Sequence, residues 1–263
     1  MTTQADRAIG ALRTGYDQLA TLVGRLRPDD LVRPSGAAEW TVAQVLSHLG
    51  SGAEINLAVV EGAIAGTGNP GAEFNQATWA RWDAMTPADQ ATSFLAANEK
   101  LLQLFEGLDE QQVADLRIDF GFFPQPLDVG AAAAMRLTEF ALHSWDVRVA
   151  FDADATVAPE ATELLADAVG SLLGFAGKAD QLDGDVTLAV ETTEPARTFG
   201  LAITDTVAVT ETSATADGVL VVPTEYFVRL VTGRHGAKYT PASVELTSAK
   251  VTLDDLRRVF PGY

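Results

Sequence analysis

The chain has 263 residues and a formal net charge of −18, from 18 Lys and Arg against 36 Asp and Glu. This charge argues against a surface for nucleic acid or anionic membrane, because such surfaces need a basic patch. The absence of cysteine excludes disulfides, cysteine-ligated zinc and a cysteine nucleophile. No apolar run approaches the roughly 20 residues that span a bilayer, and MTTQADRAIG lacks the blocks of a signal peptide. We therefore expect a soluble, cytoplasmic protein with a small-molecule ligand.

The first half of the chain has the pattern of helices. Apolar residues recur at spacings of three and four over residues 5–26, which is the stripe of an amphipathic helix. Thr41 and Gln44 form a capping box, so the next helix is expected to run from there to about residue 65. The other expected helices cover 74–82, 86–106 and a stretch that begins at Asp128. Four long helices in about 150 residues predict an antiparallel four-helix bundle.

The second half changes character. A helix over 158–176 is followed by segments whose alternation or β-branched content predicts strands. The expected strands are 185–191, 197–203, 206–211, 218–222 and 243–248. Two helices, 223–231 and 251–260, complete an α+β module. We therefore predict an all-α four-helix bundle over residues 1–154 and a smaller α+β domain over 155–263.

The stretch LTEFALHSWDVRVA reads as a helix with polar groups on its inward face. At 100° per residue, Glu139, His143 and Asp146 fall on one side. Leu137 and Ser144 fall opposite. Burying a neutral polar group without a partner costs roughly 2–7 kcal/mol, so something is expected to lie against this face.

His48 is the candidate partner from another helix. It lies seven residues after the Thr41 cap, at the edge of an apolar stripe. Two imidazoles and the Glu139 carboxylate would form a common donor set for a catalytic metal. Asp146 would then accept a hydrogen bond from an imidazole N–H. From these residues alone a satisfied polar pair in the core remains the alternative, because Glu-x-x-x-His is a weak pattern.

Three motifs resemble those of a known family. They are WTVAQVLSHL at 40–49, EFALHSWD at 139–146 and VTGR at 231–234. With them the chain resembles the mycothiol-dependent maleylpyruvate isomerase family, within the DinB/YfiT-like metal-binding superfamily. The resemblance covers nearly the whole chain and implies a DinB-like bundle followed by the family's C-terminal domain.

The resemblance implies roles for particular residues. The family's metal is held by a His of the second helix and by the Glu and His of E-x-x-x-H, which are His48, Glu139 and His143 here. Zinc suits this donor set best, with ferrous iron and nickel as alternatives. Arg234 corresponds to an arginine region that reaches the substrate in the family. The alternatives are a surface or capping role for Arg234, and Arg229 as the substrate-binding arginine.

The implied function is a metal-dependent isomerase or S-transferase that uses mycothiol as its thiol cofactor and acts on a small electrophile. A thiol with a pKa near 8.5 loses its proton when the sulfur coordinates a metal. The missing cysteine fits a thiol supplied by a cofactor. Two alternatives stay open, namely a metal-dependent hydrolase that activates water and a bundle that binds a metal or ligand without catalysis.

Overall fold

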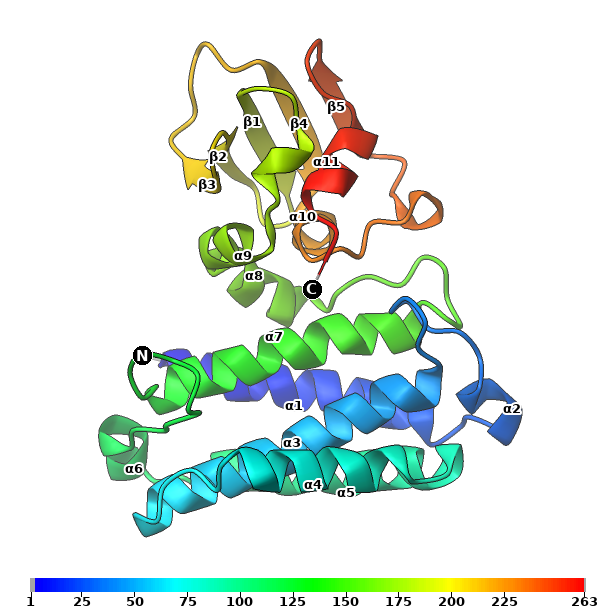
Figure 1. The fold of residues 1–263 in the computed structure, drawn as a ribbon, viewed down its shortest axis with the longest axis vertical. Helices are drawn as coiled ribbons and strands as arrows, with labels where there is room; N and C mark the ends of the chain where they lie inside the picture. The colour runs from blue at the N-terminus through cyan, green and yellow to red at the C-terminus, as the bar shows by residue number, and fades with distance from the viewer. Residues whose placement is uncertain (1–2, 263) are drawn as a thin grey trace. The chain divides into compact units, whose positions relative to one another are not determined.

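The computed structural model describes residues 3–262. The chain splits into two compact units, Met1–Ala155 and Thr156–Tyr263. Figure 1 shows that the first unit is helical and that the second combines helices with a sheet. The predicted sequence of a helical N-terminal region and an α+β C-terminal region is therefore confirmed. None of the helices within residues 3–262 is both long enough and apolar enough to cross a membrane.

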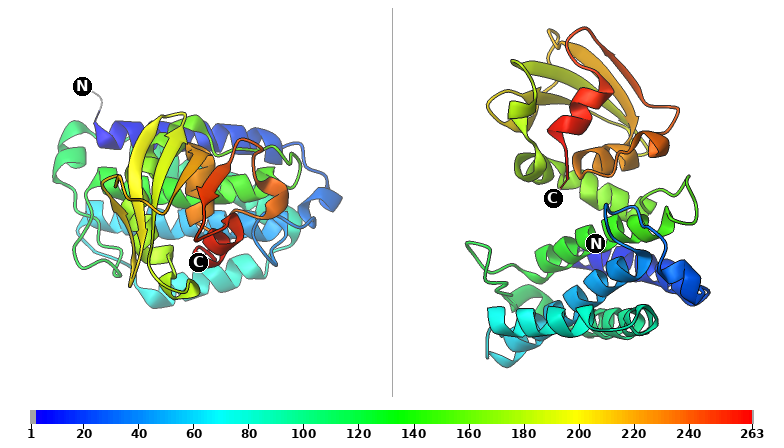
Figure 2. Two further views of the ribbon diagram at one scale, coloured as in Figure 1. Left: turned by 90° about the horizontal axis from the view of Figure 1, so that it is seen from above. Right: turned by 45° about the vertical axis from the view of Figure 1, so that its right-hand side comes forward.

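Four long helices form most of the first unit. They are α1 (Gln4–Val23), α3 (Val42–Ala65), α5 (Pro87–Glu106) and α7 (Val129–Arg148). Helix α3 packs along α5 and α7, and α1 packs along α7 and α5, so the long helices run side by side in the views of Figures 1 and 2. Shorter helices lie between them: α2 (Pro28–Leu31), α4 (Ala72–Asp83) and α6 (Glu110–Asp115). The sequence patterns did not predict α2 and α6, which are too short to show a periodic stripe.

Local capping explains where the long helices begin. The amide of Gln44 donates to Thr41 Oγ1 at 3.3 Å, and the Thr41 amide donates to Gln44 Oε1 at 2.8 Å. The amide of Ala131 donates to Asp128 Oδ1 at 2.7 Å. Such caps satisfy amides that the helix itself leaves without acceptors. Both helix starts, at Val42 and Val129, therefore lie where the sequence predicts them.

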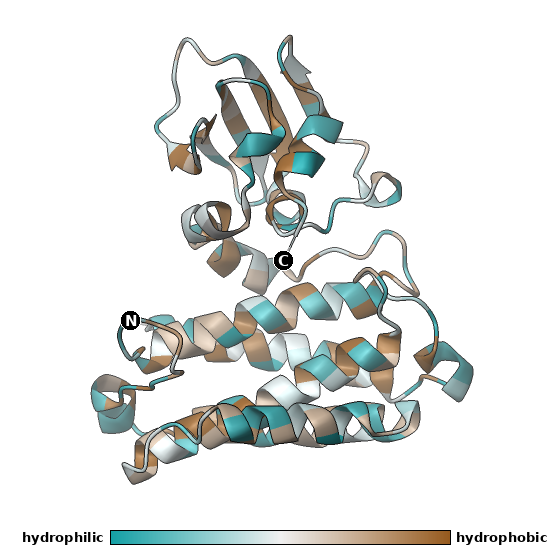
Figure 3. Ribbon diagram, viewed as in Figure 1, coloured by the Kyte–Doolittle hydropathy of each residue, from teal (hydrophilic) through white to brown (hydrophobic). Residues whose placement is uncertain are grey.

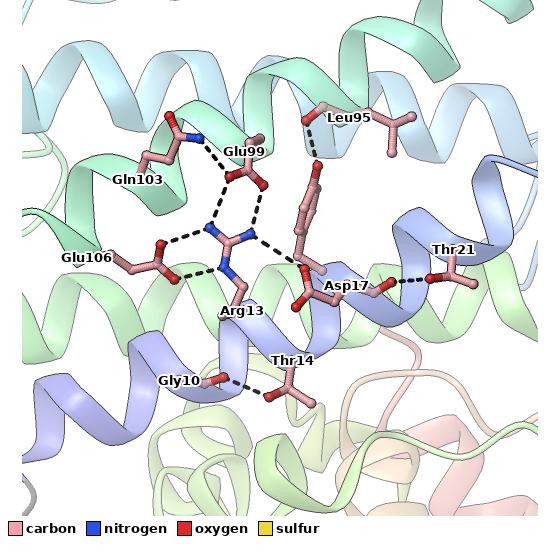
Figure 4. A network of polar contacts seen from close by, with 10 residues as sticks. Gly10, Arg13, Thr14, Asp17, Thr21, Leu95, Glu99, Gln103 and Glu106 are labelled. Atoms are coloured by element: carbon pink, nitrogen blue, oxygen red, sulfur yellow. Dashed lines mark hydrogen bonds and ion pairs between the residues drawn. The ribbon is translucent and has the colours of Figure 1, made fainter.

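An ion-pair network joins α1 to α5, as Figure 4 shows. The Arg13 guanidinium donates to Glu99 Oε2 at 2.7 Å and to Glu106 Oε1 at 2.8 Å. The hydrogen bonds from Arg13 hold the pKa of the Glu99 carboxyl below its usual value, against the opposing effect of burial. Beside it, the Tyr16 hydroxyl donates to the Leu95 carbonyl at 3.0 Å. These contacts set the position of α5 along α1.

A glycine lets α4 approach α3 closely. A Cβ atom added to Gly50 would lie 2.2 Å from the ring of Trp82, which is too close for any real side chain. Trp82 is buried on this glycine, and its indole N–H donates to Glu54 Oε2 at 3.0 Å. Arg81 also pairs with Glu54. Helix α4 is thus held against the helix that carries His48.

The second unit is built on a mixed five-stranded sheet of order β3-β2-β1-β4-β5. The strands are β1 (Val186–Thr193), β2 (Arg197–Ile203), β3 (Val207–Thr210), β4 (Gly218–Pro223) and β5 (Glu245–Ser248). Strands β1 and β4 pair in parallel, and the other neighbours pair antiparallel. The remaining elements are α8 (Pro159–Asp167), α9 (Val169–Ala176), α10 (Thr224–Val231), α11 (Leu253–Val259) and the 3-10 turns η1 (Ala179–Gln181) and η2 (Ala237–Tyr239).

Apolar side chains from the sheet and helices share one core in this unit. Val190 and Leu220 of the central strands are buried, and Phe227 of α10 packs in the same cluster. Figure 3 shows hydrophobic residues along these strands. The single helix predicted over 158–176 was wrong in one respect, because Ala168 leaves helical geometry with ψ near 1° and separates α8 from α9.

Candidate metal centre

Three side chains from two helices converge at one point of the first unit. His48 comes from α3, while Glu139 and His143 lie one turn apart on α7. The distance from His48 Nε2 to Glu139 Oε2 is 3.3 Å, and that from His143 Nε2 to the same oxygen is 3.7 Å. One donor atom from each residue lies within 4.8 Å of the others. The structure thus brings together all three residues that the sequence singled out as metal ligands.

These separations suit a small divalent ion. Bonds of about 2.1 Å in tetrahedral geometry place neighbouring donor atoms about 3.4 Å apart. The distances of 3.3 and 3.7 Å lie close to that value. Two imidazoles and one carboxylate are the donors of many catalytic zinc sites, where a further position stays open. The cluster therefore fits a metal without a change in fold.

Asp146 orients the imidazole of His143. Its Oδ2 atom lies 2.9 Å from His143 Nδ1, and its side chain is fully buried. An ionised carboxylate only accepts hydrogen bonds, so Nδ1 carries the proton and Nε2 keeps its lone pair. The Nε2 atom is the one that faces Glu139. Metal-binding histidines are commonly held in this way by a carboxylate.

Glu139 is ionised at neutral pH in spite of its partly buried position. Burial acts to raise its pKa. The hydrogen bond with His48, together with electrostatic attraction to His143, His48 and Arg136, lowers the pKa by more than burial raises it. The pKa of the Glu139 carboxyl falls to about 2. The Glu139 carboxylate therefore presents a charged oxygen to the two imidazoles across the physiological pH range.

Trp40 covers one side of the two imidazoles. Its ring centroid lies 5.2 Å from that of His48 and 6.0 Å from that of His143, with the latter ring nearly parallel. The side chain keeps 37% of its surface exposed. Trp40 lies one residue before the Thr41 cap and forms a wall of the donor cluster.

Arg136 is a buried charge that the sequence patterns did not single out. It lies three residues before Glu139 on α7, and only 3% of it is exposed. One of its nitrogens, Nη2, donates to the Leu49 carbonyl at 2.6 Å and to Asn98 Oδ1 at 2.8 Å. Burial lowers its pKa to about 10, so the guanidinium stays charged at neutral pH. The spacing from Glu139 was the available signal, because i and i+3 share a helix face.

The prediction of a single inward face on α7 was too narrow. Glu139, His143 and Asp146 do lie together, but Leu137 and Ser144 on the other side are also buried. Helix α7 packs on both α1 and α3, so it has neighbours on more than one side. Whether a polar residue of α7 is buried therefore depends on which neighbouring helix it faces.

The candidate arginines belong to the second unit. Arg229 is buried on α10, and its guanidinium is bound by Glu225 through two hydrogen bonds of 2.7 and 2.8 Å. Arg234 follows α10 and donates from Nη1 to the Thr232 carbonyl at 3.1 Å. The neighbouring His235 is half-buried, with Nε2 2.6 Å from the Phe260 carbonyl oxygen. Burial lowers the pKa of His235.

A groove adjoins the donor cluster on α3. It encloses about 420 Å³ and is lined by Trp40, Gln44, Ser47, His48, Ser51, Trp79 and Asp83. A larger pocket of about 560 Å³ lies in the second unit around residues 180–186 and 250–258. None of the three converging donors lines that larger pocket. Chemistry at the donor cluster therefore does not take place there, although the pocket is larger.

The fold and the donor cluster together define a class of protein: a helical unit with a candidate metal centre, followed by a small mixed-sheet unit. The family described as "Mycothiol maleylpyruvate isomerase N-terminal domain" matches residues 12–148, a range that contains all three donors. The chain belongs to this enzyme family, and the predicted family is confirmed. Comparison with curated proteins gave no match.

Two solved structures share the fold. One is described as the mycothiol-dependent maleylpyruvate isomerase, and the other as a variant of it with one histidine replaced by alanine. Each has a TM-score of 0.69 and 14% sequence identity, and the alignment covers 100% of this chain and of the other. The likeness to these structures therefore extends over both units of this chain.

Proposed function

We propose that the protein is a metal-dependent enzyme that uses a low-molecular-weight thiol, mycothiol, to isomerise or conjugate a small electrophile. The observation that carries this proposal is the convergence of His48, Glu139 and His143 within 4.8 Å in a chain of the mycothiol maleylpyruvate isomerase family. We assign residues 1–154 as a DinB-like four-helix bundle and 155–263 as the family's C-terminal domain.

In this proposal His48, Glu139 and His143 hold the ion, with zinc as the preferred metal. A divalent metal there supplies Lewis-acid chemistry, which lowers the pKa of a coordinating thiol or water. The chain's own residues do the positioning. Asp146 holds the His143 tautomer through the 2.9 Å contact, and Trp40 covers one side of the imidazoles. The open groove beside His48 admits a ligand.

The reaction balances without an external oxidant or reductant. A deprotonated sulfur adds to one carbon of a conjugated cis double bond, and the electron pair moves onto the neighbouring carbonyl group. The former double bond is then single and can rotate. When the electron pair returns, the carbon–sulfur bond breaks, and the trans isomer and the thiol are released. If the carbanion is protonated instead, the product is a conjugate.

A protein without cysteine must take its sulfur from a bound thiol, which agrees with this scheme. We further propose that Arg234 binds an anionic group of the electrophile, since a guanidinium pairs well with carboxylates. Arg229 is less suited to this role because Glu225 already occupies two of its nitrogens.

The experiment is turnover of a panel of small conjugated electrophiles, including maleylpyruvate. Each is assayed with mycothiol, with glutathione and without thiol, using both zinc-loaded and chelator-treated protein. We expect turnover only with mycothiol and metal together. Product analysis by NMR separates isomerisation from conjugation.

The other outcomes contradict the proposal in distinct ways. Metal-dependent release of a hydrolysis product without thiol would identify a hydrolase. Stoichiometric metal with no turnover of any electrophile would identify a binding protein. Equal turnover by zinc-loaded and chelator-treated protein would show that the reaction does not need a metal.

A further inference from the structure

The two imidazoles of the donor cluster are held in different ways. His143 donates from Nδ1 to the buried Asp146 carboxylate at 2.9 Å, which fixes the plane of its ring. The His48 ring has one hydrogen-bonding contact within residues 3–262, from Nε2 to Glu139 at 3.3 Å. Metal-binding histidines are commonly oriented by a group bonded to the second ring nitrogen. No protein group within the described residues does this for His48, so packing has to orient its ring.

Trp40 supplies that packing. Its ring centroid lies 5.2 Å from that of His48, with 51° between the ring planes. The ring of His143 lies 4.6 Å from that of His48, edge-on at 64°. These separations fall within the roughly 4.5–7 Å at which tilted aromatic rings attract each other. The His48 ring is therefore oriented by two aromatic neighbours, of which His143 already has a fixed plane.

Trp40 is also held in place, by a strap of backbone that connects α2 to α3 and comprises residues 32–41. The Ser35 amide donates to the Trp40 carbonyl at 2.9 Å, and further backbone contacts join the two ends of the strap. At Glu39 the chain turns through the left-handed region, with φ of 65°, directly before Trp40. Residues other than glycine seldom adopt this conformation, so the strap has a specific shape.

The strap is anchored on α7. The Gly36 amide donates to the Asp146 carbonyl at 2.7 Å. A Cβ atom at Gly36 would lie 2.7 Å from Val149 Cγ1, so a larger residue would push the strap away from the helix. The Arg33 guanidinium lies over the ring of Phe151, 4.8 Å from its centroid. The strap is thus bound to the same residue whose carboxylate orients the other imidazole.

We propose that Trp40 is a positioning residue of the metal centre, and that it holds the His48 imidazole in the plane that a metal ion requires. It takes the place of the hydrogen bond that orients His143. This assignment rests on the metal site of the proposed function, but not on the thiol or on the reaction. The ring contacts of Trp40 within the described residues are confined to the two imidazoles, and its side chain stays partly exposed, unlike an indole that fills a core.

The test is the zinc affinity of the full chain, measured by competition with a chelator. Trp40→Ala should lower the affinity roughly 10–100-fold, the range found when a group that orients a metal ligand is lost. Trp40→Phe keeps an aromatic face and should restore most of the lost affinity. Trp40→Leu, which keeps apolar bulk without a flat ring, should behave like Trp40→Ala and replaces it if the alanine variant does not fold.

Phe122→Ala is the matched control, because Phe122 is an exposed aromatic residue of the same unit whose ring contacts are with Phe120 and Phe123. Circular dichroism establishes that each variant is folded. Zinc affinity that is equal in Trp40→Ala and Phe122→Ala would overturn the positioning role.

A double-mutant cycle separates positioning from a general effect on stability. If Trp40 acts through His48, Trp40→Ala should cause no further loss of zinc affinity in a His48→Ala background. In an Asp146→Asn background, which disturbs only the other imidazole, the loss should remain. Equal losses in both backgrounds would show that Trp40 merely stabilises the helical unit, and would overturn the proposal.

These outcomes are independent of turnover. Reduced zinc affinity in Trp40→Ala together with no turnover of any electrophile would support the positioning role and contradict the proposed reaction. Thiol-dependent turnover together with wild-type zinc affinity in Trp40→Ala would contradict only the positioning role. A wild-type chain that binds no zinc would overturn both the ligand set and the role of Trp40.

Discussion

Arg136 Nη2 on α7 lies 2.6 Å from the carbonyl oxygen of Leu49 on α3. Leu49 follows His48, and Arg136 precedes Glu139 by one turn, so this single hydrogen bond joins the two helices that carry all three donors. Asn98 on α5 accepts from the same nitrogen at 2.8 Å. The alignment of the donor cluster therefore depends on a buried charge shared by three helices.

Replacing this arginine tests that dependence. Arg136→Met keeps much of the volume but leaves the Leu49 carbonyl and Asn98 Oδ1 without their charged donor. We expect the free energy of unfolding to fall by about 2–3 kcal/mol and zinc affinity to fall as well. Chemical denaturation and metal titration measure the two effects. The control is Arg117→Met, an exposed arginine of the same unit; equal behaviour of the two variants would refute the role of Arg136.

The two imidazoles of the cluster should be required for metal binding. His48→Ala and His143→Ala each remove one of three protein ligands, so affinity should fall more than the roughly 10–100-fold typical of a lost supporting residue. His235→Ala is the matched control because His235 contacts the Phe260 carbonyl, outside the cluster. Elemental analysis of protein purified without chelator gives the occupancy. Wild-type zinc content in both cluster variants would show that the ligand set is wrong.

Glu139→Gln distinguishes a ligand from a general base. A ligand must bring a charged oxygen within about 2.0–2.2 Å of zinc, so loss of that charge should weaken metal binding. The i, i+4 spacing from His143 favours the ligand role, because both side chains lean toward one point. Metal stoichiometry and turnover are measured on the same sample. Full metal content with lost turnover would identify a base instead.

Asp146→Asn should weaken the metal site without removing a ligand. An amide can present either a donor or an acceptor to His143 Nδ1, so the tautomer is no longer set by a buried carboxylate. We expect zinc affinity to fall roughly 10–100-fold while His48 and Glu139 remain in place. Metal titration measures the change, with Asp83→Asn as a carboxylate control outside the cluster. An affinity equal to that of the control would mean that Asp146 only packs the helix.

Arg234→Ala should act on the substrate and leave metal content unchanged. Loss of a hydrogen bond to a charged group costs about 1.5–3 kcal/mol, which lowers kcat/KM by roughly 10- to 150-fold. Arg258→Ala, at a largely exposed arginine of the same unit, is the control. Steady-state kinetics with an anionic electrophile measure the effect. An unchanged kcat/KM would assign Arg234 to a capping role, in keeping with its bond to the Thr232 carbonyl.

Local sequence determined much of the secondary structure. The Thr41 and Asp128 caps and the three-four spacing of apolar residues predicted the long helices, because capping and helix periodicity involve residues close in the chain. Glu139 and His143 could be predicted to lie on one face for the same reason, because one helical turn sets their separation. It did not reveal the break at Ala168, where the two helical stretches α8 and α9 meet.

The tertiary structure determined which residues of different helices come into contact. His48 lies 91 positions from Glu139, and only the packing of α3 on α7 brings their side chains to 3.3 Å. The burial of Arg136 follows from the same packing, and α4 is held close to α3 through Trp82 and Gly50. A charge or hydroxyl on a helix is exposed or buried according to its neighbours, and those neighbours come from distant parts of the chain.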